Sequence, residues 1–185
     1  MPDTKSHINA ETIVEALIFA APEPVHDAKL ARIAGVPREQ IGRIIDELNK
    51  KYESATRSFE IRRVAAGYAI YVKQDFAPWL EELLGGDRGI HLTRPMFEVL
   101  AIVAVKQPIT KPVIDKIRGV NSSAPLAQLL KSGLITITGR QSGPGRPFEH
   151  GTTRKFLKIF GLNSPQDIPS FEELQKMFEG TENSS

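Results

Sequence analysis

Residues 108–138, PITKPVIDKIRGVNSSAPLAQLLKSGLITIT, predict two short helices followed by a strand. The first helix ends near Gly119, because a glycine directly after an apolar-periodic segment is typical of a helix C-terminus. Ser122 or Ser123 can cap the second helix. The apolar residues of this helix share one face: Leu126, Leu129 and Leu130. The alternation in Leu134–Thr138 then indicates a strand.

The same order of elements recurs in the first half of the chain as a faint internal repeat. Pro24-Val25 and Gly35-Val36 match Pro108-Ile109 and Gly119-Val120 at an offset of 84 positions. Further apolar pairs follow the repeat, at the same offset or one residue more: Leu30 with Ile114, Ile33 with Ile117, Ile41 with Leu126, Ile44 with Leu129 and Ile45 with Leu130. The repeat predicts a duplicated domain.

Each copy is expected to consist of three helices followed by a β-hairpin. In the first copy the third helix is predicted over Pro37–Tyr52, and Phe59–Arg62 and Tyr68–Val72 predict the hairpin. In the second copy, Gly139–Pro147 is predicted to be the turn of the wing, and Gly151–Leu162 a helix capped by a threonine. The fold class is therefore mainly α with small β-hairpins, arranged as tandem winged-helix domains.

The predicted domain boundary is the glycine-rich segment Gly85–Gly89, whose glycines are costly inside a helix or strand. Residues 1–88 form the N-terminal winged-helix domain. Residues 89–162 form the C-terminal winged-helix domain. Residues 163–185 are an acidic tail that is expected to be partly disordered and to fray beyond Phe178.

The first helix of each copy is apolar on almost every side, over residues 13–21 and 99–105. A helix at the surface of a small domain has one solvated side, so each of these helices should have a second buried face. Another part of the chain could cover that face, but an interface between molecules is the favoured alternative. We therefore expect a partner protein, a homodimer or both, and for a homodimer the expected interface consists of Ile13, Val14, Leu17 and Ile18.

Composition excludes several classes of protein. The chain has 185 residues, 41% of them hydrophobic and 25% charged, so whole-chain disorder is excluded. It contains no cysteine, and therefore no disulfide or thiolate metal site. No stretch is long and apolar enough to span a membrane, and the polar N-terminus lacks a signal sequence, so we expect a cytoplasmic protein.

Charge is distributed unevenly along the chain. Residues 94–158 contain 11 Lys and Arg against 3 Asp and Glu, a net charge of +8, whereas residues 159–185 have a net charge of −4. A basic helix-turn-helix domain invites a DNA-binding hypothesis, but recognition helices need long polar side chains that reach base edges. The exposed positions here are Ala124, Ala127, Gln128 and Lys131, which argues against sequence-specific reading. Weak, non-specific phosphate contact is the more plausible form of DNA binding.

Sequence motifs point away from catalysis and from cofactors. The wing loop lacks the lysine and hydroxyl that end a phosphate-binding loop, so it is not expected to bind a nucleotide phosphate. Arg140 and Arg146 lie near its base, where they are better suited to bind an acidic group of a partner. The four histidines are His7, His26, His91 and His150, and they show no metal-ligand spacing. No nucleophile motif occurs. We expect no enzyme activity, no cofactor and no metal.

Several segments together resemble the bacterial segregation and condensation protein B family. They are Glu98–Thr110, Ile117–Val120, Gly139-Arg140, Pro144–Pro147, Gly151–Thr153, Phe160–Leu162 and Asp167–Pro169, whose order and spacing fit over residues 10–175. The resemblance implies two winged-helix domains and a homodimer formed through the N-terminal domains. It also implies binding to the kleisin ScpA and, through it, to the SMC ATPase. Such a protein is a non-catalytic, nucleoid-associated subunit in chromosome condensation and partition.

The resemblance also implies a partner-binding surface in the second domain. It consists of Val105, Lys106, Gln107, Arg140, Arg146, Thr152 and Thr153. Two positions depart from the family pattern, which usually has an aromatic residue in place of Val105 and commonly a tyrosine in place of His150. The alternative function is that of a winged-helix transcription regulator.

Overall fold

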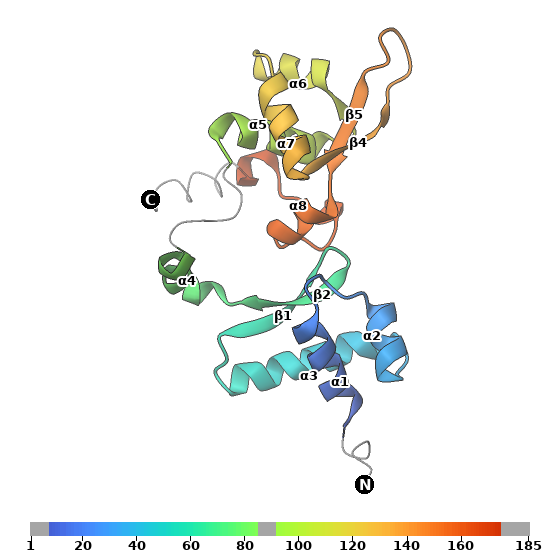
Figure 1. Cartoon of the computed structure of the whole chain (residues 1–185), viewed down its shortest axis with the longest axis vertical. Coiled ribbons are helices and arrows are strands. Elements are labelled where there is room, and N and C mark those ends of the chain that lie inside the picture. The colour runs from blue at the N-terminus through green and yellow to red at the C-terminus, as the bar shows by residue number, and fades with distance from the viewer. Residues whose placement is uncertain (1–7, 85–91, 175–185) are drawn as a thin grey trace. The chain divides into compact units, whose positions relative to one another are not determined.

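The computed structural model describes residues 8–84 and 92–174. Contacts divide the chain into two compact units, residues 1–87 and 88–185, which we call the N-terminal and C-terminal units (Figure 1). Each unit combines helices with a small antiparallel sheet, as the sequence predicts. The predicted linker Gly85–Gly89 and the predicted fraying beyond Phe178 lie outside the described residues.

The N-terminal unit has three helices followed by a hairpin and a short fourth helix. In chain order the elements are α1 (Ala10–Ala20), α2 (Asp27–Ala34), α3 (Gln40–Ser54), β1 (Phe59–Val64), β2 (Gly67–Val72), the 3-10 helix η1 (Gln74–Phe76) and α4 (Ala77–Leu84). The third helix begins later than the sequence predicts, because Pro37 lies in a preceding turn, where its carbonyl accepts a hydrogen bond from the N–H of Gln40 at 3.0 Å. Ala65 and Ala66 join the strands with positive φ angles of 48° and 60°, as a tight two-residue hairpin turn requires.

Polar contacts fix α1 on α3 beside the apolar core of this unit. The Tyr52 hydroxyl donates a hydrogen bond to Oε1 of Glu15 at 2.7 Å. Burial, and secondly this hydrogen bond, raise the pKa of Tyr52 above its ordinary value, so the hydroxyl remains a donor at neutral pH. The N-terminus of α1 is capped by Asn9, whose side-chain oxygen accepts from the N–H of Thr12 at 2.8 Å.

The C-terminal unit follows the same order with an additional strand and helix. Its elements are α5 (Arg94–Lys106), β3 (Ile109–Thr110), α6 (Lys111–Arg118), α7 (Ser123–Ser132), β4 (Ile135–Arg140), β5 (Phe148–Thr152), α8 (Arg154–Ile159) and the 3-10 helix η2 (Pro165–Asp167). The sheet has the order β3-β5-β4. The predicted helix Gly151–Leu162 is shorter than expected, because Gly151 and Thr152 pair with β4 as part of β5.

The internal repeat is visible in equivalent local structures. Val25 forms an isolated antiparallel bridge with Tyr68, and Ile109 pairs with His150 in the same way at the start of the second copy. Gly35 and Gly119 end α2 and α6 in the left-handed conformation, with φ angles of 71° and 72°. The two units therefore share the three-helix and hairpin plan of winged-helix domains.

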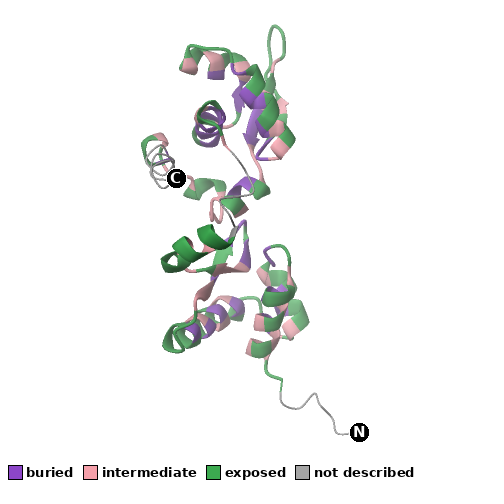
Figure 2. Cartoon of the chain, turned by 60° about the vertical axis from the view of Figure 1, so that its left-hand side comes forward, coloured by how far each residue is buried: buried purple, intermediate pink, exposed green. Residues whose placement is uncertain are grey.

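The two apolar first helices differ in how far the chain buries them (Figure 2). In α5 the buried residues lie on nearly every side: Met96, Phe97, Val99, Leu100, Ala101, Ile102, Val103 and Ala104. For α5 the second buried face is thus supplied within the chain, by contacts that include α6, α7 and β5, rather than by another molecule. In α1 only Val14 and Ile18 are buried, and Phe19 is 75% exposed.

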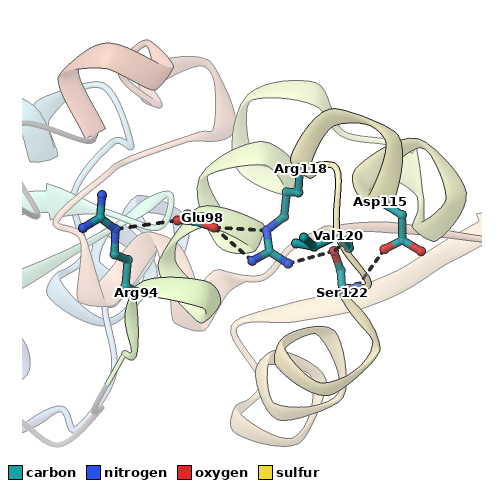
Figure 3. A network of polar contacts seen from close by, with 6 residues as sticks. All are labelled: Arg94, Glu98, Asp115, Arg118, Val120 and Ser122. Carbon is teal, nitrogen blue, oxygen red and sulfur yellow. Dashed lines mark hydrogen bonds and ion pairs between the residues drawn. The ribbon is translucent and has the colours of Figure 1, made fainter.

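A network of polar side chains holds α5, α6 and the start of α7 together (Figure 3). The Arg118 guanidinium, with a side chain only 8% exposed, donates to Oε2 of Glu98 at 2.9 and 3.2 Å and to Oγ of Ser122 at 3.0 Å. Asp115 accepts from the backbone N–H of Ser122 at 2.8 Å and is paired with Lys111. Ser122 is fully buried, so these bonds satisfy polar groups that water does not reach.

Replacing Arg118 should destabilise the C-terminal unit. Arg118→Ala leaves the buried Ser122 hydroxyl without this donor and Glu98 without its main cation, so we expect a loss of about 1–3 kcal/mol in the free energy of unfolding. Urea titration followed by circular dichroism measures the loss. The matched control is Arg43→Ala, which removes an exposed i,i+4 ion pair with Glu47 and should cost less than about 0.5 kcal/mol. Equal effects would contradict a structural role for Arg118.

Asp115 should make stability depend on pH in acid. The hydrogen bond from Lys111 lowers the pKa of Asp115 below its ordinary value of 3.8; burial opposes this, and the hydrogen bonds from Ser122 lower it further. Because the folded pKa lies below the unfolded one, the stabilisation is present above pH 3.8 and is lost as the pH falls through the folded pKa. Urea midpoints measured between neutral and acid pH should therefore fall less steeply for Asp115→Asn than for the wild type. Parallel curves would exclude this contribution.

Candidate partner-binding site

The C-terminal end of α5 presents two of the predicted site residues to solvent. Val105 and Lys106 are exposed, and Lys106 forms no ion pair within the described ranges. The next residue, Gln107, plays a different part. Its Nε2 donates to the carbonyl of Ala104 at 3.1 Å, and its Oε1 accepts from the N–H and hydroxyl of Thr152 at 2.7 and 3.0 Å. Gln107 thus ties the end of α5 to β5.

Thr152 and Thr153 are also committed to the fold. The Thr153 hydroxyl donates to the carbonyl of Gly133 at 2.7 Å and accepts from the N–H of Phe156 at 3.2 Å, so it caps α8 and fixes it to the end of α7. The backbone packs closely here, since a Cβ at Gly151 would lie 2.9 Å from Oε1 of Gln107. These contacts leave the two threonines half-buried.

The wing carries the other two predicted residues, both exposed. The Arg140 guanidinium lies over the ring of Phe148, 3.9 Å from its centroid, as a cation–π pair. Arg146 lies in the turn at a φ of 38° and forms no ion pair among the residues that the structure describes. The wing therefore combines positive charge with an exposed aromatic ring.

The predicted residues occupy two places on one sheet rather than one cluster. Arg140 pairs with Phe148, whereas Gln107 contacts Thr152 at the other end of β5. Four residues of strand separate Phe148 from Thr152, which corresponds to about 13 Å. A partner that contacts both Lys106 and the wing must extend over at least this distance.

Sequence reasoning missed the apolar part of the wing. Ile137 and Phe148 are 46% and 43% exposed. Alternation in β4 placed Ile137 on the same face as Ile135, but the structure buries Ile135 and leaves Ile137 exposed. The cation–π pair could be predicted only from the register of the hairpin, which the sequence does not give.

The exposed face of α7 has few side chains that could contact the bases of DNA. It consists of Ser123, Ala124, Ala127, Gln128 and Lys131. Only Gln128 and Lys131 have side chains long enough to reach base edges. The arrangement suits contact with a protein better than sequence-specific contact in the major groove.

The predicted dimer interface on α1 is divided between core and surface. Val14 and Ile18 are buried in the core of their own unit, and Leu17 packs partly against it. Ile13 is half-buried. The largest exposed apolar side chains of the N-terminal unit lie elsewhere: Phe19 on α1, and Trp79 and Leu83 on α4.

Within residues 8–84 and 92–174, His, Asp and Glu side chains do not gather in groups of three or more that could hold a metal ion. In these residues, no helix is long and apolar enough to cross a membrane.

Comparison with known proteins relates almost the whole chain to one family. Residues 12–171 match the family model described as segregation and condensation complex subunit ScpB. The chain is 37% identical to the segregation and condensation protein B of Syntrophotalea carbinolica over 95% of this chain and 88% of that protein. It is 38% identical to that of Symbiobacterium thermophilum over 89% of this chain and 74% of that protein.

Solved structures give related matches. Mycobacterium tuberculosis ScpB is 30% identical, with 83% of this chain and 95% of that chain covered and a TM-score of 0.39. A dimer of an ScpB N-terminal domain complexed with a ScpA peptide is 27% identical, with 40% of this chain and 93% of that chain covered and a TM-score of 0.38.

Gln107 should prove to be a structural residue rather than a contact residue. Gln107→Met keeps the length of the side chain but leaves the half-buried N–H of Thr152 without its acceptor, so we expect a loss of about 1–3 kcal/mol in the free energy of unfolding. Chemical denaturation measures it. Gln128→Met, on the exposed face of α7, is the matched control and should be nearly neutral. If Gln107→Met leaves the free energy of unfolding unchanged, the fold does not need Gln107, and its side chain is available for binding a partner.

Proposed function

The chain belongs to the family of the segregation and condensation complex subunit ScpB, and from this premise we propose that it is a non-catalytic subunit of the bacterial SMC–kleisin complex. It acts as a homodimer that binds the kleisin ScpA in chromosome condensation and segregation. The observation that carries the proposal is the family match over residues 12–171, which includes both winged-helix units. The dimer and the ScpA peptide of the solved N-terminal domain are properties of that related protein, and we extend them to this chain as parts of the proposal.

The two units have separate roles in this proposal. Residues 1–88 dimerise, and the exposed Phe19 and Trp79 support this, because large apolar side chains on a surface favour association. Residues 89–162 bind the kleisin, and residues 163–185 form an acidic tail. The protein works in the cytoplasm on the nucleoid and reaches the SMC ATPase through the kleisin, with at most weak, non-specific contact to DNA.

The kleisin-binding surface in this proposal consists of exposed side chains supported by buried ones. Val105, Lys106, Arg140 and Arg146 contact the partner. Gln107, Thr152 and Thr153 hold the backbone beneath them, as their hydrogen bonds to each other and to α7 and α8 indicate. The exposed positive charge of Lys106, Arg140 and Arg146 suits an acidic stretch of the kleisin.

Size-exclusion chromatography with light scattering tests the proposal directly. The chain alone should have the mass of a dimer, and addition of the kleisin from the same genome should produce a stable heavier complex. If the chain forms no complex with the kleisin, the proposed function is wrong. A folded wild-type monomer that still binds kleisin would overturn only the dimer.

Charge reversal locates the surface. Lys106→Glu with Arg146→Glu should weaken kleisin binding by roughly tenfold or more, because two attractive contacts become repulsive. The matched control is Lys116→Glu with Lys131→Glu, two exposed lysines of the same unit outside the proposed kleisin surface, which should change the affinity little. Isothermal titration measures both. Equal affinities for a folded Lys106 and Arg146 variant and the wild type would remove these residues from the interface.

A further inference from the structure

One face of α6 carries exposed apolar side chains that the fold does not use. Val113 and Ile117 lie one turn apart and are 43% and 46% exposed, and Val120, just after the helix, is 56% exposed. The opposite side of the helix packs on the core through the fully buried Ile114. We call Val113, Ile117 and Val120 the α6 apolar face. From Val113 to Val120 it extends about 10 Å, or two turns of helix.

This face is held in a fixed orientation. Arg118 joins the end of α6 to Glu98 of α5, and Asp115 joins its middle to the start of α7 through Ser122, as Figure 3 shows. Gly119 ends the helix in the left-handed conformation, and its N–H donates to the carbonyl of Asp115 at 2.8 Å. A helix fixed by polar contacts along its length presents its outer side chains with little entropic cost on binding.

The internal repeat shows that the winged-helix fold does not require this face. At the offset of 84 positions, Val113, Ile117 and Val120 correspond to Lys29, Ile33 and Val36. Lys29 is an exposed charge, and Val36 packs against the core of the N-terminal unit. Of these three positions, the N-terminal copy thus has an exposed apolar residue only at Ile33. Three such residues are particular to α6.

The charges around the face indicate what it binds. Residues 94–158 contain only three acidic side chains: Glu98 is paired with Arg118, Asp115 is paired with Lys111, and Glu149 lies on β5 opposite Thr110. Lys116, between the stripe residues on α6, is exposed and forms no ion pair in the described part of the chain. An apolar stripe with uncompensated positive charge is complementary to an amphipathic helix with acidic flanks.

We propose that the α6 apolar face binds an acidic amphipathic helix of a partner protein. The helix lies with its apolar side on Val113, Ile117 and Val120, and an acidic residue pairs with Lys116. This surface is additional to the kleisin-binding residues at Lys106 and on the wing, and it does not depend on the proposed function.

A synthetic helical peptide tests the proposal on the full-length chain. The probe is about 20 residues long, with leucines spaced three and four residues apart and glutamates flanking them. Its matched counterpart has lysine in place of each glutamate. Fluorescence anisotropy gives the affinities, and NMR chemical shifts locate the peptide. The acidic peptide should bind and perturb residues 111–121, and the basic peptide should not bind.

Isosteric variants distinguish binding at this face from a non-specific attraction of the acidic peptide to a basic protein. Val113→Thr with Val120→Thr keeps the shape of the side chains but places hydroxyls against the apolar peptide, so affinity should fall about tenfold. Val72→Thr, at an exposed valine of β2, is the control and should bind as the wild type does. Unchanged thermal unfolding of all variants ensures that only the surface differs.

Three results would overturn the proposal. The double threonine variant could bind the acidic peptide as tightly as the wild type, or the wild type could fail to bind it. Alternatively, the peptide could displace residues 175–185 from α6, which would make the chain's own tail the occupant instead of a partner.

Discussion

Glu98 and Gln107 anchor the N-terminal half and the C-terminal end of α5, the first helix of the C-terminal unit. Between them, residues 99–104 of α5 are all buried, and only Val105 and Lys106 at the end of the helix are exposed. Glu98 fixes the first half of the helix to α6 through Arg118, and Gln107 fixes its end to β5 through Thr152. Since apolar packing has no preferred direction, these polar contacts determine how the surrounding helices and strands are oriented on the helix.

Because these polar residues hold the C-terminal unit together, fewer of its polar side chains are available to bind a partner. Thr153 caps α8, and Gly151 has no space for a side chain beside Gln107. Part of the segment that resembles the family's partner-binding motif is therefore explained by packing inside the unit. The side chains that remain exposed to a partner are the cations next to this segment. The family match and the exposed positive charge are consistent with a winged-helix unit that binds protein, with α7 too poor in long polar side chains to read DNA.

The two copies of the winged-helix plan show how a shared frame supports different surfaces. The bridges at Val25 and Ile109 and the left-handed ends at Gly35 and Gly119 are common to both. Their exposed side chains differ, because residues that face solvent can change without cost to the core. Phe19 of the N-terminal unit and the α6 apolar face of the C-terminal unit are such differences, and each is a large apolar group left on the surface.

Local patterns in the sequence determined the helices, the hairpins and the duplicated order, because periodicity and capping act over a few residues. The apolar stripe of α3, formed by Ile41, Ile45, Leu48 and Tyr52, and the glycine ends of α2 and α6 are of this kind. The strand β3 could not be predicted, since two residues carry no periodicity and pair with the distant His150 and Glu149. The same reason explains why Arg118, Ser122 and Phe148 were missed as organising residues: their roles arise from contacts across the fold. Sequence alone supplied the family resemblance and the candidate residues, whereas tertiary structure decided which of those residues are exposed and which hold the fold together.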